Sequence, residues 1–264
     1  MKKNNEEIKG VLHRQVSEDS YHLRRYFPSD YFNGFIEQFW LVNWNLEGQR
    51  THTQKNLPDP NFHLIITNEG IKLLGPVSKI YSYKMEGVGR IIGVKFECGA
   101  LKELLPLPIE EYVNREILAK EIFGSDLEDT LIALYEYEND SAVISHIQDY
   151  LASFVQPITK QKATTQSLVS LIKNNENIYT VTQVASYAKV SSRAVQRYFS
   201  KYVGLSPKWL IRKYRLSRAL DELENSSVSI LDIVTKLEYV DQSHLIRDFK
   251  EILGITPSRY KKLK

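Results

Sequence analysis

Between Asn177 and Leu220 the chain has nine lysine or arginine residues and no acidic residue. An arginine guanidinium can donate two parallel hydrogen bonds to guanine in the major groove of DNA, and a glutamine amide can pair in the same way with adenine. A lysine ammonium neutralises a backbone phosphate without reading the base. The chemistry that these residue types allow together is the binding of a nucleic acid.

The charge of the whole chain is divided unevenly between its two ends. Residues 160–264 contain 19 lysines or arginines against 9 acidic residues, whereas residues 1–159 contain 16 against 23. A surface that is basic only for solubility would intersperse the two signs. The asymmetry therefore favours a basic module that meets a polyanion, attached to an acidic domain.

A short phrase occurs twice within the basic part, at a constant offset of fifty. "RYFSKYVGLSPKWL" fills residues 197–210, and "RDFKEILGITPSRY" fills residues 247–260. The shared positions are Arg197 and Arg247, Phe199 and Phe249, Gly204 and Gly254, and Pro207 and Pro257. Each copy predicts a helix, a left-handed glycine stop, and a new helix with proline in its first turn. We expect Phe199, Phe249 and Tyr198 to lie in the core.

The elements that must position these residues are helices. Apolar residues recur at three and four positions in seven segments, which are 165–175, 180–188, 191–203, 206–224, 229–239, 241–253 and 256–264. Thr180 with Gln183 fits a capping box, and Ser229 with Asp232 is a looser version. Short helices crossed through a tight turn at 180–203 and 229–253 indicate two helix-turn-helix units. Helical hairpins also build scaffolds, but two copies are too few for a solenoid.

The helix predicted between the two units sets their spacing. Nineteen residues at 1.5 Å each give about 28 Å, and major grooves on one face of DNA recur at about 34 Å. One chain could therefore place two recognition helices in adjacent grooves.

The segments "VASYAKVSSRAVQRYFSKYVGLSP" and "DQSHLIRDFKEILGITPSRYK" resemble the DNA-binding domain of the AraC-type (AraC/XylS) bacterial transcription regulators. The resemblance implies seven helices, double-stranded promoter DNA as partner, and RNA polymerase as a further partner if the protein is an activator. The base-contacting positions that it implies are Arg193, Gln196 and Arg197 in the first unit, and Gln242, Ser243, Ile246 and Arg247 in the second.

Other cations are placed to contact phosphates. These are Lys189, Lys201, Lys208, Arg212, Lys250 and Arg259. The second turn departs from the family pattern, because Glu238 stands where glycine is usual. Asp241, Asp248 and Glu251 add carboxylates to the second recognition helix, so we expect the first unit to carry most of the specificity.

The N-terminal part predicts an α+β chain in which a β-rich barrel or sandwich with helices precedes the all-α domain. Strands are expected at 34–46, 61–68, 71–75, 79–85 and 89–97, and helices at 100–105, 126–138 and 141–154. The predicted domains are a sensor and dimerisation domain at 1–155 (β-rich 20–97, helical 98–155), a linker at 156–164, and the DNA-binding domain at 165–264. The helices at 126–138 and 141–154 either close the first domain or form a homodimer interface.

"YFPSDYFNGFIEQFWLVNW" and "IIGVKFECGALKELLPLPIEEYVN" resemble a cupin-like sensor domain found in many AraC-type regulators, whose effector is generally unassigned. An aromatic-rich barrel could hold a small-molecule effector. The candidates to line such a pocket are Trp40, Trp44, Phe62, Tyr81 and Phe96, although most are expected to be core.

Two alternatives belong to other function classes. A metal-binding cupin needs clustered ligands, and "THT" at 51–53 offers one histidine where a pair is wanted. Cys98 could serve a regulator that repairs alkylated DNA, but a lone cysteine among apolar residues is more often a small buried hydrophobe. No nucleophile–base pair and no phosphate-binding loop is visible, so we expect no enzyme, no metal and no cofactor.

Length and composition place the chain among ordinary globular proteins. With 42% apolar and 25% charged residues, 264 residues suggest one large or two ordinary domains. A single cysteine excludes an internal disulfide. No apolar run approaches a membrane span of about 18 residues, and the start lacks the apolar core of a signal peptide. We therefore expect a cytoplasmic location and no membrane partner.

Overall fold

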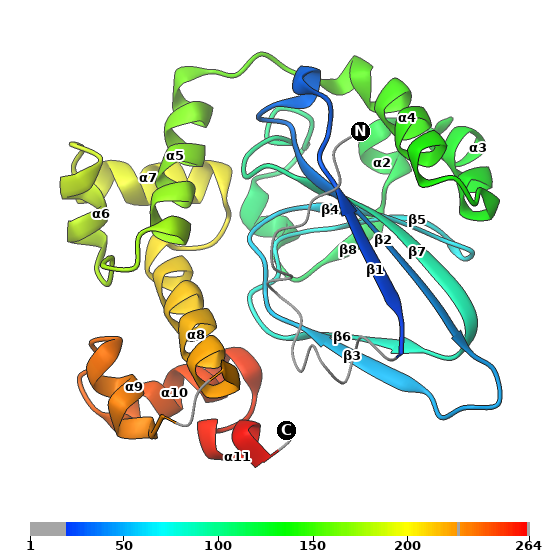
Figure 1. Ribbon diagram of the computed structural model, residues 1–264. Helices are drawn as coiled ribbons and strands as arrows, with labels where there is room; N and C mark the ends of the chain where they lie inside the picture. Colours follow the sequence, from blue (N-terminus) through cyan, green and yellow to red (C-terminus); the bar gives the residue numbers. More distant parts are fainter. Residues whose placement is uncertain (1–19, 226–227, 263–264) are drawn as a thin grey trace.

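The computed structural model describes residues 20–225 and 228–262. Its N-terminal part is β-rich and its C-terminal part is helical, as expected (Figure 1). The strands are β1 (His22–Tyr26), β2 (Ile36–Leu46), β3 (His52–Asn56), β4 (His63–Thr67), β5 (Gly70–Leu74), β6 (Tyr81–Met85), β7 (Gly87–Phe96) and β8 (Glu116–Leu118).

The strands form two antiparallel layers. Six of them make one sheet in the order β1-β2-β7-β4-β5-β8, and β3 pairs with β6 in a separate ribbon. Strands β1, β3 and β8 were not expected from the sequence. Because β8 pairs with β5, the sheet extends beyond the predicted β-rich region of 20–97.

Strand β2 shows how the alternation of side chains divides the two faces of the sheet. Phe39 and Leu41 are fully buried in the main core, which the helices of this domain complete. Trp40, Val42 and Trp44 belong to a smaller cluster with residues of the ribbon strand β6. Because successive side chains of a strand point to opposite faces, β2 contributes to the main core on one face and to the cluster between the sheet and the ribbon on the other.

Two glycines of β7 make room for the tryptophans of the neighbouring strand. Gly93 lies opposite Trp40, and Gly89 lies opposite Trp44. A Cβ atom at Gly93 would stand 1.9 Å from the Trp40 ring, and one at Gly89 would stand 2.1 Å from the Trp44 ring. These indoles therefore lie flat across the strand only because neither position carries a side chain.

Short helices cover the core face of the sheet. They are the α-helices α2 (Lys120–Phe123), α3 (Leu127–Leu131) and α4 (Asp140–Leu151) and the 3-10 helices η1 (Asp30–Phe32), η2 (Ile109–Tyr112), η3 (Ile132–Glu136) and η4 (Ala152–Phe154). The helix expected at 100–105 is wrong, because the chain forms consecutive turns up to Leu104 and bends at Pro106. The segment 126–138 is helical only in part, since α3 passes into 3-10 geometry at Ile132.

Seven α-helices follow in the described residues of the C-terminal part, 160–225 and 228–262. They are α5 (Lys160–Asn174), α6 (Val181–Tyr187), α7 (Ser192–Tyr202), α8 (Pro207–Asn225), α9 (Ile230–Lys236), α10 (Gln242–Leu253) and α11 (Pro257–Lys262). Helix α8 runs between the α6–α7 pair and the α9–α11 group (Figure 1). Helix α5 begins earlier than expected, because the Thr159 side chain caps it by accepting from the amide of Lys162. The last residues of the predicted linker are therefore helical.

The two parts of the chain are packed against each other. Leu57 and Ile80 of the β-rich part lie against the core of the second helix-turn-helix unit, and the Ile80 amide donates to the Ile252 carbonyl over 3.0 Å. The Trp209 indole donates to the Ser78 carbonyl over 3.1 Å. The β-rich part thus contacts both the second helix-turn-helix unit and α8.

Candidate nucleic-acid interface

The first helix-turn-helix unit consists of α6 and α7. Thr180 and Gln183 form the expected capping box, and Ser191 caps α7 by accepting from the amide of Ala194. Lys189 in the turn has a φ of 54°, a left-handed conformation that disfavours residues with a Cβ atom. The sequence suggested this strain only for the second turn.

One face of α7 is buried and the opposite face carries the predicted base-contacting side chains. Val195 and Phe199 are fully buried, while Arg193, Gln196 and Arg197 are exposed. Tyr198 is only partly buried at the edge of this core. The Arg197 guanidinium lies 5.6 Å from the centre of the Tyr198 ring, so the arginine is partly ordered before any ligand is bound.

The second unit, α9 and α10, has the same layout. Ser229 and Asp232 form a complete capping box, and Asp241 caps α10 by accepting from the amide of His244 over 2.7 Å. The predicted base-contacting residues divide into three that are exposed, Gln242, Ser243 and Arg247, and one that is half-buried, Ile246. Phe249 is fully buried, as expected.

The turn of the second unit carries the predicted irregularity. Glu238 has a φ of 52° and is exposed. The connection between α9 and α10 is one residue longer than that between α6 and α7, which agrees with the sequence offset. Glu238 therefore adds both backbone strain and a negative charge at the edge of this unit.

Five of the predicted phosphate-contacting residues are exposed, and one is not available. The exposed residues are Lys189, Lys201, Lys208, Lys250 and Arg259. Arg212 differs from them, because it is half-buried and its guanidinium forms ion pairs with Asp248 and Glu251 on α10. Burial lowers the pKa of Arg212, but the hydrogen bonds with these carboxylates outweigh it and the pKa is raised. Arg212 ties α8 to the second recognition helix.

The same ion pairs correct the expectation that Asp248 and Glu251 repel phosphates. Asp248 is 1% exposed, and Arg212 neutralises it over 2.8 Å. The hydrogen bond with Arg212 also lowers the pKa of Glu251. The other acidic residues described in this unit are exposed: Asp232 completes the capping box of α9, Asp241 caps α10, and Glu238 lies in the turn.

Arg215 joins the two units, a role that its position in the sequence did not suggest. Its guanidinium lies 5.0 Å from the ring of Tyr179, which precedes α6, and 4.8 Å from the ring of Tyr239, which precedes α10. It also donates to the Tyr179 carbonyl over 3.1 Å. Arg218 donates to the carbonyls of Asn175 and Glu176. Several cations of the acid-free stretch therefore hold the domain together.

A group of buried charges lies between the β-rich part and the helices. Lys95 pairs with Asp59 over 2.8 Å and with Glu37 over 3.2 Å, and Lys173 of α5 pairs with Glu37 over 3.2 Å. Lys213 of α8 is 9% exposed. Burial lowers the pKa of Lys213 to about 8, although the carboxylate of Asp59 opposes this shift.

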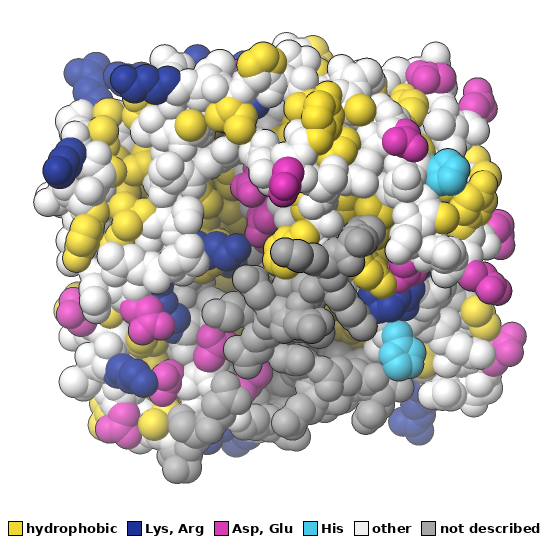
Figure 2. Space-filling view, turned by 45° about the horizontal axis from the view of Figure 1, so that its top comes forward, with side chains coloured by type: hydrophobic (Ala, Val, Ile, Leu, Met, Phe, Trp, Pro, Cys, Tyr) yellow, Lys and Arg dark blue, Asp and Glu magenta, His cyan; other side chains and the backbone are white. Residues whose placement is uncertain are grey.

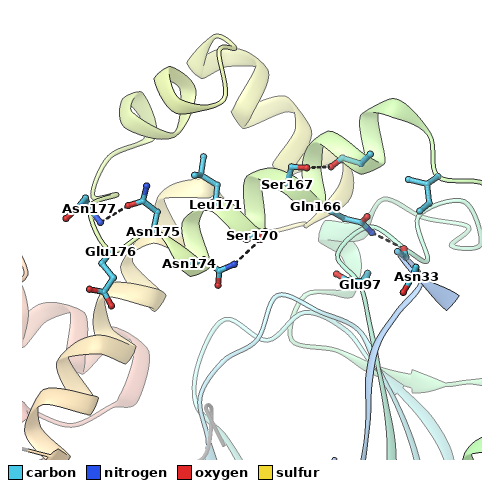
Figure 3. A pocket seen from close by; sticks show the side chains of 13 residues that line it. Asn33, Glu97, Gln166, Ser167, Ser170, Leu171, Asn174, Asn175, Glu176 and Asn177 are labelled. Atoms are coloured by element: carbon cyan, nitrogen blue, oxygen red, sulfur yellow. Dashed lines mark hydrogen bonds between the residues drawn. The ribbon is translucent and has the colours of Figure 1, made fainter. Parts of the chain in front are cut away.

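A polar groove lies between α5 and the residues Asn33 and Gly34, which precede β2 (Figure 3). Its volume is about 1060 Å³. The Gln166 amide crosses it, donating to the Gly34 carbonyl over 2.9 Å and to the Cys98 carbonyl over 3.3 Å. Burial raises the pKa of Glu97, which lines the groove.

A cavity of about 240 Å³ lies in the β-rich part, between the sheet and the β3–β6 ribbon. Of the five expected lining residues, Trp40 and Tyr81 border it. Trp44 packs beside it and donates to the Glu86 carbonyl over 3.1 Å, while Phe62 and Phe96 belong to the main core. Sequence reasoning missed the polar residues of its wall, among which are His63, Asp59 and Lys95.

The structure also shows the residues on which the repair and metal-binding alternatives depend. Cys98 is 3% exposed, and burial raises the pKa of its thiol well above the usual range, so the reactive thiolate is disfavoured. Within residues 20–225 and 228–262, no three His, Cys, Asp or Glu side chains are grouped as metal ligands. No helix in the same described ranges is long and apolar enough to cross a membrane.

Comparisons with known proteins were made for both parts. Residues 184–263 match a family described as a helix-turn-helix domain, and residues 24–118 match a domain of unknown function, DUF6597. The regulator GbdR of Pseudomonas aeruginosa PAO1 is 33% identical over 93 residues, which are 35% of this chain and 25% of that protein. The activator AarP of Providencia stuartii is 29% identical over 113 residues, 40% of this chain and 84% of that protein.

The chain spans only part of the length of several relatives that it matches. The chain covers 35% of an uncharacterized helix-turn-helix regulator of Haemophilus influenzae, at 28% identity. Among solved structures, ToxT from Vibrio cholerae matches 93% of this chain and 98% of its own with 12% identity and a TM-score of 0.39.

Proposed function

We propose that this chain, which carries a helix-turn-helix domain of the AraC type, is a transcription regulator that binds promoter DNA through both of its helix-turn-helix units. The observation that carries the proposal is the exposed face of α7, where Arg193, Gln196 and Arg197 project opposite a fully buried face. Arginine and glutamine are the side chains that form bidentate contacts with guanine and adenine. Gln242, Ser243 and Arg247 occupy the corresponding face of α10.

The spacing of the units supports the reading of two adjacent major grooves. Helix α8 has 19 residues and is therefore about 28 Å long, close to the groove repeat of about 34 Å. The ion pairs of Arg212 and the stacking of Arg215 fix both units on this helix. A DNA site should accordingly contain two short conserved blocks about one helical turn apart.

The surface charge fits the same function. Dark-blue lysine and arginine side chains gather at the upper left of Figure 2, whereas magenta side chains lie over the right and also at the lower left. We expect the exposed Lys189, Lys201 and Lys208 to neutralise phosphates beside the first unit, and Lys250 and Arg259 beside the second.

The test is a selection of duplexes from a random pool, followed by titration of the full chain in fluorescence anisotropy. Arg197→Ala should weaken the selected duplex by about 1–3 kcal/mol and relax discrimination at one base pair. Lys55→Ala, an exposed lysine on β3, is the matched control and should change neither quantity. If Arg197→Ala weakened binding to selected and random DNA equally, Arg197 would be a phosphate contact and not a base contact. If wild type bound no duplex at low salt, the proposed function would be refuted.

The cavity beneath the sheet supports a second element of the proposal, control by an organic small molecule. Its wall combines the Trp40 and Tyr81 rings with charged and amide side chains, as ligand pockets commonly do. It also includes Asp59 and Lys95, which belong to the charged group in contact with the DNA-binding helices. A ligand there would act directly on the contact between the two parts.

Thermal melting tests this element. An organic effector predicts a melting temperature that is unchanged by dialysis against a chelator and raised by members of a compound library. Tyr81→Ala should remove that rise, and Lys55→Ala should keep it. A large fall after the chelator that zinc or iron restores would favour the metal-binding alternative.

A further inference from the structure

A concave surface lies between the first recognition helix and a loop of the β-rich part. Its volume is about 470 Å³. Helix α7 contributes Arg197, Ser200 and Lys201, and the loop contributes Lys102 and Glu110 on either side of the segment Leu105–Ile109. Two parts of the chain that are about ninety residues apart therefore share one surface beside a predicted base-contacting arginine.

The loop is held against the C-terminal end of α7 by close packing. Gly204, which ends this helix with a φ of 76°, lies against the Ile109 side chain, so that a Cβ atom there would stand 2.7 Å from Ile109 Cγ2. A Cβ atom at Gly99, which precedes the loop, would stand 3.0 Å from the Tyr202 side chain. The position of Lys102 relative to the exposed face of α7 is thus fixed.

The charges of this surface are unbalanced. Three cations line it, Lys102, Arg197 and Lys201, against the single carboxylate of Glu110. Within residues 20–225 and 228–262, neither Lys102 nor Arg197 is in an ion pair; Lys201 donates to the Gln161 side-chain oxygen. Of the loop side chains that line this surface, Lys102 is the basic one.

We propose that Lys102 binds a backbone phosphate of the DNA that α7 reads, so that the β-rich domain extends the DNA-binding surface of the first unit. The inference rests on the proposed function. With Arg197 directed at bases, the strand that borders the groove passes the C-terminal half of α7, where Ser200 and Lys201 face the loop. A phosphate there meets Lys102 and Lys201 together, and Glu110 opposes it.

Salt-dependent titration of the full chain tests this contact with opposite charge changes on one loop. Each phosphate contact contributes about 0.9 to the slope of log affinity against log salt. Lys102→Gln should weaken selected and random duplexes alike and reduce the slope by about 0.9, so that the loss is roughly three- to fourfold greater at 50 mM than at 200 mM salt. Lys102→Arg should restore both, and Glu110→Gln should tighten binding to both duplexes.

The controls separate this inference from the function on which it rests. Lys55→Gln, on the β3 strand, should leave affinity and slope unchanged, and melting curves check that each variant is folded. An unchanged or tighter complex with Lys102→Gln, when Lys201→Ala weakens it, would overturn the inference alone. The inference would also be overturned if inorganic phosphate raised the melting temperature of wild type but not of Lys102→Gln, while both bound DNA with the same affinity. Failure of wild type to bind any duplex would instead refute the proposed function.

Discussion

Replacing Glu238 by glycine should stabilise the protein and tighten its complex with DNA for two separable reasons. The residue has a φ of 52° and an exposed side chain. A residue with a Cβ atom in this conformation destabilises the folded state by about 1–2 kcal/mol. Glycine removes this strain, but it lowers the unfolding free energy by about 0.4–1 kcal/mol because it makes the unfolded chain more flexible. The net gain in unfolding free energy should be about 0.5–1 kcal/mol.

The matched variant Glu238→Ala separates backbone strain from charge. It removes the carboxylate but keeps the Cβ atom, so its stability should stay near that of wild type. Both variants should bind DNA more tightly at low salt, because both remove a negative charge at the edge of the second unit. Lys189→Gly, with a φ of 54° in the first turn, should show the same stabilisation but weaker binding.

Urea unfolding and fluorescence anisotropy measure the two effects. For a chain of this size, a gain of this magnitude raises the melting temperature by about 1–4 °C. A Glu238→Gly variant that is less stable than wild type would refute the assignment of strain. A Glu238→Ala variant that is as stable as the glycine variant would show that the stabilisation comes from charge and not from φ.

Three further predictions concern the contacts that hold the parts together. Gly254→Ala should lower the unfolding free energy by about 1 kcal/mol, because of its φ of 70° alone. Gly204→Ala should lower it by distinctly more, because its new Cβ atom would also meet Ile109 of the β-rich part. Equal losses of the two variants in urea unfolding would contradict this contact. Because burial lowers the pKa of Lys213 to about 8, below its ordinary 10.5, the folded state binds fewer protons between these values and stability should rise with pH from about 8 to 10. Lys213→Met should flatten this rise and should be more stable than wild type at pH 7 by up to about 3 kcal/mol. If the variant and wild type had the same profile of melting temperature against pH, the lowered pKa of Lys213 would be contradicted. Arg212→Met should lose about 3–5 kcal/mol by leaving the buried Asp248 without its arginine, and Arg212→Met with Asp248→Leu should recover most of it. Additive losses in a double-mutant cycle would mean that the pair is not coupled.

Much of the DNA-binding domain could be predicted because its signals are local. A capping box spans four residues, as at Thr180–Gln183, and a left-handed stop needs only a glycine, as at Gly204 and Gly254. Apart from the start of α5, the described helix bounds therefore agree with the sequence within about three residues. The same reasoning failed at 100–105, where apolar spacing resembles a helix but the prolines that follow leave room only for turns.

The effector candidates show where pattern alone stops. Trp40 and Trp44 share one face of β2, so alternation assigns them the same surroundings. Only the position of the ribbon makes Trp40 a wall of the cavity, while Trp44 packs over Gly89 and donates to the Glu86 carbonyl. Phe96 faces the main core instead.

The sequence by itself determined the two helix-turn-helix units, their spacing along α8 and the basic character of the domain, because each depends on residues within about a turn of one another or on composition. Only the tertiary structure decided which cations remain free to meet DNA. Asp248 lies 36 residues from Arg212 along the chain, and the rings around Arg215 come from two different units. An ion pair or a stacked contact depends on distance in space, so a count of charges along the chain cannot separate a side chain that binds phosphate from one that holds the fold.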